Sequence, residues 1–442
     1  MKFQGREEEL AILERARQDS LAGSSRMTLV TGRRRNGKTS LVIRSLGREK
    51  MLYWHTGARS EAEVSETFAR EAWKSLGLFL SPGLTSLPEL FECLMQSSKS
   101  TPFTLIVDEY RQFASFGEDL LDRMLAVWDR HKDDTHLHLV LIDSSFSMKN
   151  RSGDTYQSLL ERVTTELKVE AFGPKKLKAL LAIAAPNYSN DDLLALYALT
   201  GGVPFYVADL LDNGAVTKEK MIERMLSAGT IYALEGRDLL HIEVGYPSDR
   251  YEAVLGAIAE GARKTADIAK KSGVENVSAY LDRLEGYGFV EKQRPIFAKA
   301  NTRSVRWTIK DPFLRFWFRF ISPNEGLLEA GFSERTIEKI KSDYPTFSGP
   351  ILERWFREAL MESGRYRAVG SWWNSARGAG GGQTGVDIVA VTIDGRKAYV
   401  AEVKRQRKSF REHEFLDKVE GLKTMFLHGV EVETACLSLE DM

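Results

Sequence analysis

Short apolar runs separated by amphipathic stretches fill the first 170 residues of the chain. The runs are Met27–Thr31, Met51–His55, Phe103–Val107, Leu137–Ile142 and Glu166–Val169. Strands that alternate with helical stretches are typical of a parallel sheet with crossover helices. We therefore predict an α/β fold for residues 1–170.

The hydrophobic pattern changes twice in the middle of the chain. Residues 171–246 carry Leu and Ala at helical spacing, interrupted by a turn at Gly201–Pro204. Residues 247–322 predict a compact helical unit that ends in a hairpin, with Thr265–Lys271 and Val277–Leu284 as its second and third helices. Turn-forming residues at Ser322–Gly326 predict a linker.

The last block, residues 349–442, combines one helix with strands. A helix is expected at Pro350–Ser363, and strands are expected at Tyr366–Ser371, Val386–Thr392 and Ala398–Val403. The glycine-rich run Gly378–Gly382 predicts a loop between the first two strands. The four blocks predict an α/β core, a mostly helical region, a compact helical unit that ends in a hairpin, and a second α/β domain.

Composition limits the class of protein. The chain has 442 residues, 43% of them hydrophobic, with 62 basic and 62 acidic side chains, which fits a globular protein without an overall basic surface. Cys93 and Cys436 lie far apart, which argues against a disulfide framework or a zinc site. No apolar run reaches the ~20 residues of a membrane span, and the N-terminus lacks the apolar core of a secretory signal. We expect a cytoplasmic protein that does not enter a membrane.

A phosphate-binding loop follows the first strand. The segment from Gly32 to Thr39 fits GxxxxGK[ST] in full, and Ser40–Leu46 continues as a helix. Backbone N–H groups of such a loop surround phosphate oxygens, Lys38 would reach the β- and γ-phosphates, and the Thr39 hydroxyl would bind Mg²⁺. The residues expected to contact ATP are Gly32, Arg33, Arg34, Arg35, Asn36, Gly37, Lys38, Thr39 and Ser40. The alternative is a chance glycine-rich turn.

An acidic pair supports this interpretation. Asp108 and Glu109 end the apolar run that starts at Phe103, which resembles a Walker B motif. Asp108 would hold the Mg²⁺ shell, and Glu109 would activate the attacking water. Taken alone, the pair could also be a solvated turn. The additional strand at Met51–His55 favours the ASCE arrangement over that of the nucleotide kinases.

The N-terminal motifs resemble those of the archaeal-type ATPases, which belong to the AAA+ and STAND-like P-loop proteins. The segment Phe3–Leu10, with Gly5 and Arg6, looks like the box that helps seat the adenine in these proteins. The resemblance implies that Ser144 or Ser145 senses the γ-phosphate. Asp143 stands where the family pattern would have glycine.

Two further features follow from the same resemblance. Arg162 would be a finger that reaches the site of a neighbouring subunit, which implies a homo-oligomer; a solvated arginine at a helix end is the alternative. The turn at Gly201–Pro204 looks like that of the family's helical lid.

Residues 247–322 resemble a winged helix, a fold that often binds DNA through its third helix. That helix carries Asp282 and Glu285 against Arg283, which suits phosphate poorly. The wing is more basic, through Lys292, Arg294, Lys299, Arg303 and Arg306. DNA contact through the wing and a purely structural role both stay open. The segment Asp311–Phe320 is similar to a signature of the same family, and its aromatic side chains are expected to pack in a core.

The C-terminal block resembles a PD-(D/E)xK nuclease. Two strands would bring Asp387, Glu402 and Lys404 together, with Glu353 as an additional carboxylate. The resemblance implies a Mg²⁺ site at Asp387, Glu402 and Glu353, with Lys404 placing the attacking water. Strands with charged outer faces, or an intact fold without activity, are the alternatives. The basic tract 404–408 with Arg411 would suit a phosphate backbone or an exposed helix start.

Together these features predict an ATPase that controls a DNA-acting nuclease, with ATP and Mg²⁺ as cofactors and DNA as partner. The alternative is an ATP-gated DNA-binding or protein-binding regulator with an inactive nuclease fold.

Overall fold

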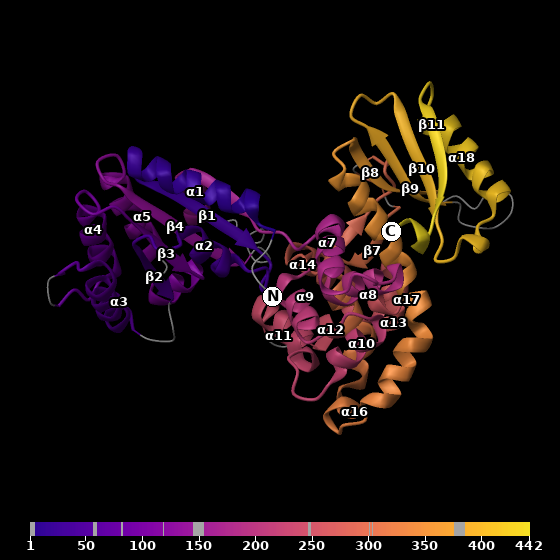
Figure 1. Cartoon of the computed structure of the whole chain (residues 1–442), viewed down its shortest axis with the longest axis horizontal. Coiled ribbons are helices and arrows are strands. Elements are labelled where there is room, and N and C mark those ends of the chain that lie inside the picture. Colours follow the sequence, from indigo (N-terminus) through magenta and orange to yellow (C-terminus); the bar gives the residue numbers. More distant parts are fainter. Residues whose placement is uncertain are drawn as a thin grey trace. The chain divides into compact units, whose positions relative to one another are not determined.

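The structure is a computed structural model, shown in Figure 1. It describes residues 5–55, 60–80, 83–117, 119–144, 154–245, 249–299, 301–302, 304–374 and 385–442. The chain forms two compact units, one that ends at Ala171 and one that runs from Phe172 to Met442.

The N-terminal unit is a parallel sheet between helices. Its helices are α1 (Glu7–Ala22), α2 (Lys38–Leu46), α3 (Glu61–Leu76), α4 (Leu87–Ser97), the 3-10 helix η1 (Tyr110–Phe116), α5 (Leu120–His131) and α6 (Asp154–Leu160). Its strands are β1 (Arg26–Gly32), β2 (Met51–His55), β3 (Phe103–Asp108), β4 (Leu137–Ser144) and β5 (Thr165–Lys168). All five predicted strands are present, each within two residues of its expected bounds.

The strand order is β2-β3-β4-β1-β5, and every neighbouring pair is parallel. Strand β4 lies between β1, which leads into the phosphate-binding loop, and β3, which ends in the acidic pair. Because the carboxyl ends of parallel strands meet at one edge, this order brings both motifs to the same edge. The predicted ASCE arrangement is confirmed.

Helices cover both faces of this sheet. Apolar side chains of α1 and α2 pack on one face, where Leu13, Leu41 and Val30 are buried together. Helices α3, α4 and α5 pack on the other face, where Trp54 of β2 stacks on Phe68 of α3 with ring centroids 4.6 Å apart. Successive residues of each buried strand point to opposite faces, which is why these strands are apolar throughout.

The second unit begins with a helical region. Its helices are α7 (Pro174–Ala184), α8 (Asn190–Thr200), α9 (Pro204–Asp212), α10 (Lys218–Leu226), α11 (Tyr232–Val244), α12 (Asp249–Ala259), α13 (Thr265–Ser272) and α14 (Val277–Gly286). The two-stranded antiparallel ribbon β6 (Val290–Gln293) and β7 (Arg306–Ile309) follows α14, so three helices precede a hairpin as expected.

An aromatic segment follows β7 and forms much of the core of this unit. It consists of α15 (Pro312–Phe316) and the π-helix η3 (Trp317–Ile321). Phe313, Phe316 and Phe320 are completely buried, and the Trp317 indole donates a hydrogen bond of 2.8 Å to the Tyr232 carbonyl. The expectation that these aromatic side chains pack in a core is confirmed.

The predicted linker at Ser322–Gly326 is wrong, because the chain stays helical there. The 3-10 helix η4 (Ser322–Asn324) and α16 (Glu325–Glu329) lead directly to α17 (Ser333–Glu362). Glu325 pairs with Arg237 of α11, and the Asn324 amide donates to the Phe320 carbonyl at 2.7 Å. These contacts hold a segment whose composition alone favours a turn.

The long helix α17 also begins earlier than the expected start at Pro350. Two prolines, Pro345 and Pro350, lie inside it. Interior proline removes a backbone hydrogen bond and normally ends a helix. Here Tyr344, Phe347 and Ile351 are buried along the same helix, and this packing outweighs the loss.

A four-stranded mixed sheet completes the second unit. Its order is β11-β10-β9-β8, from β8 (Tyr366–Trp373), β9 (Gly385–Thr392), β10 (Lys397–Val403) and β11 (Glu431–Leu437). Strands β8, β9 and β10 are antiparallel, and α18 (Glu412–Phe426) leads to β11, which is parallel to β10. The core that contains α17 lies on one face and α18 packs on the other.

Some expectations concern residues outside this description. Arg303, Ser145 and the glycine-rich run 378–382 lie outside the described residues. Within the described part of the chain, no helix combines the length and the apolar character needed to cross a bilayer.

Candidate functional site

The phosphate-binding loop connects the end of β1 to the start of α2. Gly32 packs so tightly that a Cβ there would lie 2.4 Å from the Val169 carbonyl oxygen. Gly37 caps α2 with φ of 80°, in the left-handed region that glycine adopts without strain. The loop therefore ends at a helix N-terminus, which carries partial positive charge and free N–H groups.

Lys38 and Thr39 are already oriented at the start of α2. The buried Lys38 ammonium donates to the carbonyls of Gly32 at 2.8 Å and Arg33 at 3.2 Å, so it lies within the curl of the loop. The Thr39 hydroxyl donates to Asp108 Oδ2 at 2.6 Å. A hydroxyl and a carboxylate from two motifs thus meet, which is the oxygen pair expected to hold Mg²⁺ beside a triphosphate.

Asp108 is held by three hydrogen bonds. Besides Thr39, the Tyr53 hydroxyl donates to its Oδ2 at 2.8 Å and the Glu109 N–H to its Oδ1 at 3.0 Å. Burial, and then the bond to Asp108, raises the pKa of Tyr53 well above its usual range, so the phenol remains a donor. Sequence reasoning missed Tyr53. Its only signal is its place in β2, the strand beside β3.

Glu109 has an unusual backbone conformation. Its φ of 51° lies in the left-handed region, which costs a non-glycine residue about 1 kcal/mol. The residue sits directly after β3 and precedes η1. Strain of this kind clusters at sites where a side chain must be aimed, in agreement with a role for Glu109 in orienting water.

Other predicted nucleotide contacts serve to hold the loop. Arg6 donates to the Glu170 carbonyl at 2.6 Å and pairs with Glu9 at 2.7 Å, and the Asn36 amide donates to the Val169 carbonyl at 2.9 Å. Both side chains therefore tie the loop to the segment after β5. Gly5 lies just before α1, Arg33 is buried, Arg35 is half-buried, and Arg34 and Ser40 are exposed.

Ser144, the candidate γ-phosphate sensor, lies at the end of β4, whereas Arg162, the candidate arginine finger, is paired within its own chain. Ser144 is paired in the backbone register with Gly32, so this end of β4 lies beside the loop. The preceding Asp143 is buried in an ion pair with Arg111, a contact that sequence reasoning did not anticipate. Arg162 follows α6 and donates two hydrogen bonds, of 2.9 and 2.6 Å, to Asp129. Its guanidinium is therefore held within its own chain.

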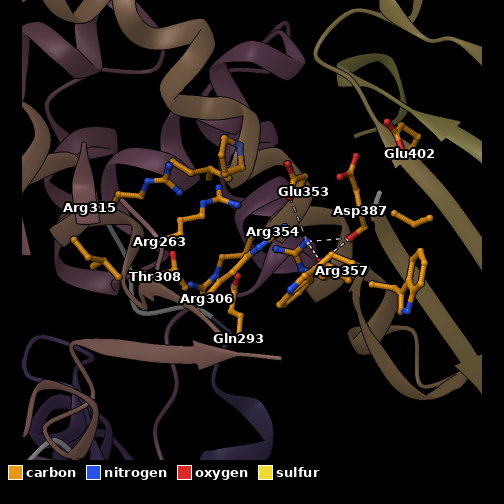
Figure 2. A pocket seen from close by; sticks show the side chains of 18 of the residues that line it. Arg263, Gln293, Arg306, Thr308, Arg315, Glu353, Arg354, Arg357, Asp387 and Glu402 are labelled. Carbon is orange, nitrogen blue, oxygen red and sulfur yellow. Dashed lines mark hydrogen bonds and ion pairs between the residues drawn. The ribbon is translucent and has the colours of Figure 1, made fainter. Parts of the chain in front are cut away.

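A cavity of about 270 Å³ in the second unit gathers the carboxylates of the predicted nuclease site. Asp387 of β9, Glu402 of β10 and Glu353 of α17 all line it, as Figure 2 shows. Ala401 pairs with Ile388 across the two antiparallel strands, and one further step of this register sets Glu402 opposite Asp387. Opposite residues of antiparallel strands project from the same face of a sheet.

The Asp387 and Glu402 carboxylates accept hydrogen bonds from the backbone and from lysine side chains. Asp387 Oδ2 accepts the Val403 N–H at 2.9 Å, while Glu402 Oε1 accepts from Lys404 at 2.9 Å and Lys418 at 3.2 Å. Burial, followed by the nearby Glu353 carboxylate, raises the pKa of Asp387 to about 7. The charge of Lys404 acts in the opposite direction but does not outweigh these two effects.

The fit to Mg²⁺ differs between the two sites. Thr39 and Asp108 already touch, as ligands of one ion would. Among the described residues, no three His, Cys, Asp or Glu side chains are grouped closely enough to hold a metal. At the C-terminal site, Lys404 and Lys418 neutralise Glu402. Any ion would have to bind Asp387 and Glu402 in competition with these two lysines.

Most basic residues proposed to contact DNA are engaged within the chain. Lys292 pairs with Asp282 at 2.9 Å and Glu285 at 2.8 Å, so α14 neutralises part of the positive charge of the ribbon. Arg306 lies 4.3 Å from the centre of the Trp373 ring. In the basic tract Arg405 pairs with Asp191, Arg407 with Asp441 and Arg411 with Glu414, whereas Arg294, Lys299 and Lys408 are exposed.

Comparison with known proteins supports the N-terminal assignment. Residues 3–210 match a family model described as an ATPase domain predominantly from Archaea, and residues 317–416 match one described as Archaea bacterial proteins of unknown function. An uncharacterized protein of Methanocaldococcus jannaschii is 28% identical over 412 residues, covering 91% of this chain and 87% of its own length.

Two solved structures share the fold. The Walker-type ATPase of Pyrococcus abyssi aligns with 72% of this chain and 96% of its own, at 18% identity and a TM-score of 0.52. The ORC2 protein of Aeropyrum pernix aligns with 75% of this chain and 96% of its own, at 14% identity and a TM-score of 0.51. The N-terminal part of the chain is therefore an ATP-binding and ATP-hydrolysing domain that is similar to this ATPase family, and residues 317–416 are similar to a family of unknown function.

Proposed function

We propose that this protein is an ATPase whose nucleotide state controls a Mg²⁺-dependent DNA nuclease centre in its second unit. The observation that carries the nuclease half is the cavity that Asp387, Glu402 and Glu353 line from two strands and a helix. A bound Mg²⁺ would polarise a phosphodiester and lower the pKa of an attacking water.

The residues around the cavity have distinct tasks in this proposal. Asp387 and Glu402 would hold the metal. Glu353 lines the same cavity, but it is not grouped with these two closely enough to be a third ligand in the described structure. Lys404 lies 2.9 Å from Glu402 Oε1 and neutralises its charge. With a metal ion bound to Glu402, Lys404 would be free to turn toward the attacking water and position it. The raised pKa of Asp387 supports a cation here, because a metal ion would favour the ionised carboxylate.

Purified protein should cleave plasmid or linear DNA with Mg²⁺ or Mn²⁺, and Asp387→Ala should abolish cleavage. Binding of the metal alone gives an independent measurement. Mn²⁺ should raise the unfolding temperature of the wild type, since a ligand that binds only the folded state stabilises it, and should not do so for Asp387→Ala. Absence of both effects would contradict the nuclease proposal.

The second candidate function is an ATP-gated DNA-binding or protein-binding regulator with an inactive nuclease fold. The observation in its favour is that Lys404 and Lys418 already neutralise Glu402. DNA binding without cleavage would support a DNA-binding regulator. Neither binding nor cleavage would point to a protein partner.

A further inference from the structure

The cavity at Asp387 has a second wall made of arginines. Basic side chains outnumber acidic ones along its lining: the cations are Arg263, Arg306, Arg315, Arg354, Arg357 and Lys418, and the carboxylates are Glu353, Asp387 and Glu402. Figure 2 shows Arg263, Arg306 and Arg315 on one side and the carboxylates on the other.

Part of this positive charge is already balanced. Arg357 lies 3.6 Å from Glu353, Lys418 lies 3.2 Å from Glu402, and Arg354 pairs at 2.7 Å with Glu358 outside the cavity. These three cations therefore have carboxylate partners.

The other three come from the three-helix and ribbon region. Arg263 lies between α12 and α13, Arg306 is on β7 and Arg315 is in α15. Neither Arg263 nor Arg315 forms an ion pair with a carboxylate in the described part of the chain, and the buried Nε of Arg315 has no hydrogen-bond partner.

Two neighbouring guanidinium groups without an anion are electrostatically unfavourable. Burial, and then the charge of Arg263, lowers the pKa of Arg315 to about 10, although the charge of Glu353 acts in the opposite direction. A further anion beside Arg315 would therefore stabilise its buried guanidinium. The planar, forked guanidinium matches phosphate oxygens in a bidentate fashion, so phosphate is the anion that this wall suits.

The size of the cavity restricts what can carry that phosphate. At about 270 Å³ it lies below the ~300–1,000 Å³ of pockets that enclose a drug-sized molecule. Two paired strands around a major groove about 12 Å wide cannot enter such a space. One phosphate with its sugar can.

We propose that Arg263 and Arg315 bind a phosphate of an unpaired DNA strand and present it to the carboxylates of Asp387 and Glu353. This inference rests on the proposed nuclease function and adds its substrate class: single-stranded or frayed DNA.

The test is binding of a short fluorescent single-stranded oligonucleotide and of the matching blunt duplex to full-length protein, with EDTA and without nucleotide. We expect the single strand to bind about 10-fold more tightly than the duplex. Arg263→Gln and Arg315→Gln should each weaken single-strand binding about 10-fold and reduce the salt dependence by about 0.7 in the log–log slope, as expected for one lost phosphate contact. Arg335→Gln removes an exposed arginine of α17 outside the cavity and should change neither quantity.

Unfolding temperatures of all variants accompany the binding data. If Arg315→Gln does not fold, Arg263→Lys replaces it, because lysine keeps the charge and loses the bidentate fork. Single-strand affinity that is the same in wild type, Arg263→Gln and Arg263→Lys would overturn the inference, and so would tighter binding of the duplex.

Cleavage assays with Mg²⁺ separate this inference from the proposed function. Arginine-dependent binding of single strands without any cleavage would reject the nuclease and retain the phosphate site. Cleavage of intact duplex at full rate by Arg263→Gln would retain the nuclease and reject the phosphate site.

Discussion

The two sites of this protein are built in opposite ways. The nucleotide site takes its lysine and hydroxyl from one continuous loop, and a single neighbouring strand adds Asp108. The cavity in the second unit collects its lining from positions as far apart as Arg263 and Lys418. In the first site the polar side chains of Lys38, Thr39 and Asp108 already form hydrogen bonds within the protein. In the second site burial raises the pKa of Asp387 and lowers the pKa of Arg315.

This difference has a physical origin. A phosphate-binding loop needs backbone N–H groups in one tight curve, which a short segment can form by itself. A site that binds a bridging metal and a phosphate backbone needs charges on facing walls, and no local segment has two facing walls. The second site therefore depends on how α17, the ribbon and the mixed sheet pack.

Removal of the loop lysine should have the largest effect. Lys38→Ala should reduce ATP turnover by on the order of 10³-fold or more and weaken ATP binding, because the fixed cation at the β- and γ-phosphates is lost. Steady-state hydrolysis and nucleotide titration measure both. Lys50→Ala, at an exposed lysine after α2, should leave both unchanged. Equal turnover in Lys38→Ala and Lys50→Ala would contradict the site.

Arg162 tests whether the nucleotide site is complete within one chain. If Arg162 acts in a neighbouring subunit, Arg162→Ala should lose about 10³-fold in turnover yet retain ATP affinity. Mixing it with Lys38→Ala protein should restore part of the activity through hybrid interfaces. The matched variant Asp129→Asn removes the intrachain partner and should keep its turnover. A strictly monomeric wild type with full activity would contradict a role of Arg162 in a neighbouring subunit. Equal losses of turnover in Arg162→Ala and Asp129→Asn would show that Arg162 acts only through its ion pair with Asp129.

Glu109→Gln separates binding from chemistry. We expect ATP affinity to be retained and turnover to fall about 10²-fold or more, because only the group that activates water is lost. Single-turnover hydrolysis and binding of a nonhydrolysable analogue are the measurements. Wild-type turnover in Glu109→Gln would refute this role.

Tyr53→Phe should have a smaller effect on the same site. The lost hydroxyl leaves Asp108 with the Thr39 and Glu109 hydrogen bonds, so the carboxylate is less firmly positioned. We expect turnover to fall by about 5-fold, corresponding to roughly one hydrogen bond, with the Mg²⁺ concentration for half-maximal activity raised. An unchanged Mg²⁺ dependence would show that Tyr53 does not position Asp108.

The smallest effect concerns the stability of the second site without metal. The pKa of Asp387 is about 7 in the folded chain and would be about 3.9 unfolded, so its charge opposes folding above pH 7. That opposition fades as the pH falls toward 4, where the carboxyl is protonated in both states. In EDTA, Asp387→Asn should raise the unfolding temperature by about 5 °C at pH 8 and by almost nothing at pH 4. A constant difference across this range would exclude titration as its cause.

Sequence patterns predicted the N-terminal fold closely because they are local there. Each buried parallel strand is a short apolar run with a helix on either side, and the loop glycines mark where the first strand ends. They failed at Ser322–Gly326 and at the start of α17. In both places turn-forming residues lie in helices. The pairing of Glu325 with Arg237 stabilises the first helix, and the burial of Tyr344 and Phe347 stabilises the second.

The residues of the candidate sites show the same difference between local motifs and long-range contacts. Lys38, Thr39, Asp108 and Glu109 were predicted because each belongs to a short motif with a fixed role. Asp387, Glu402 and Glu353 were proposed from a resemblance, and the structure brings them to one cavity. Tyr53, Arg111, Lys418 and the arginines at 263 and 315 had no local signal, because each acts on a residue that is distant in the sequence.

The sequence by itself therefore determined the parallel order of secondary elements, the phosphate-binding loop and the acidic pair, since hydrophobic periodicity and a contiguous motif are enough for each. Only the tertiary structure decided that Asp108 also accepts a phenol from β2, that Arg162 is tied to Asp129, and that arginines of the ribbon region face the carboxylates of β9 and α17. These are contacts between segments that the chain separates widely. Burial and charge in the packed core select them, and no local pattern encodes that packing.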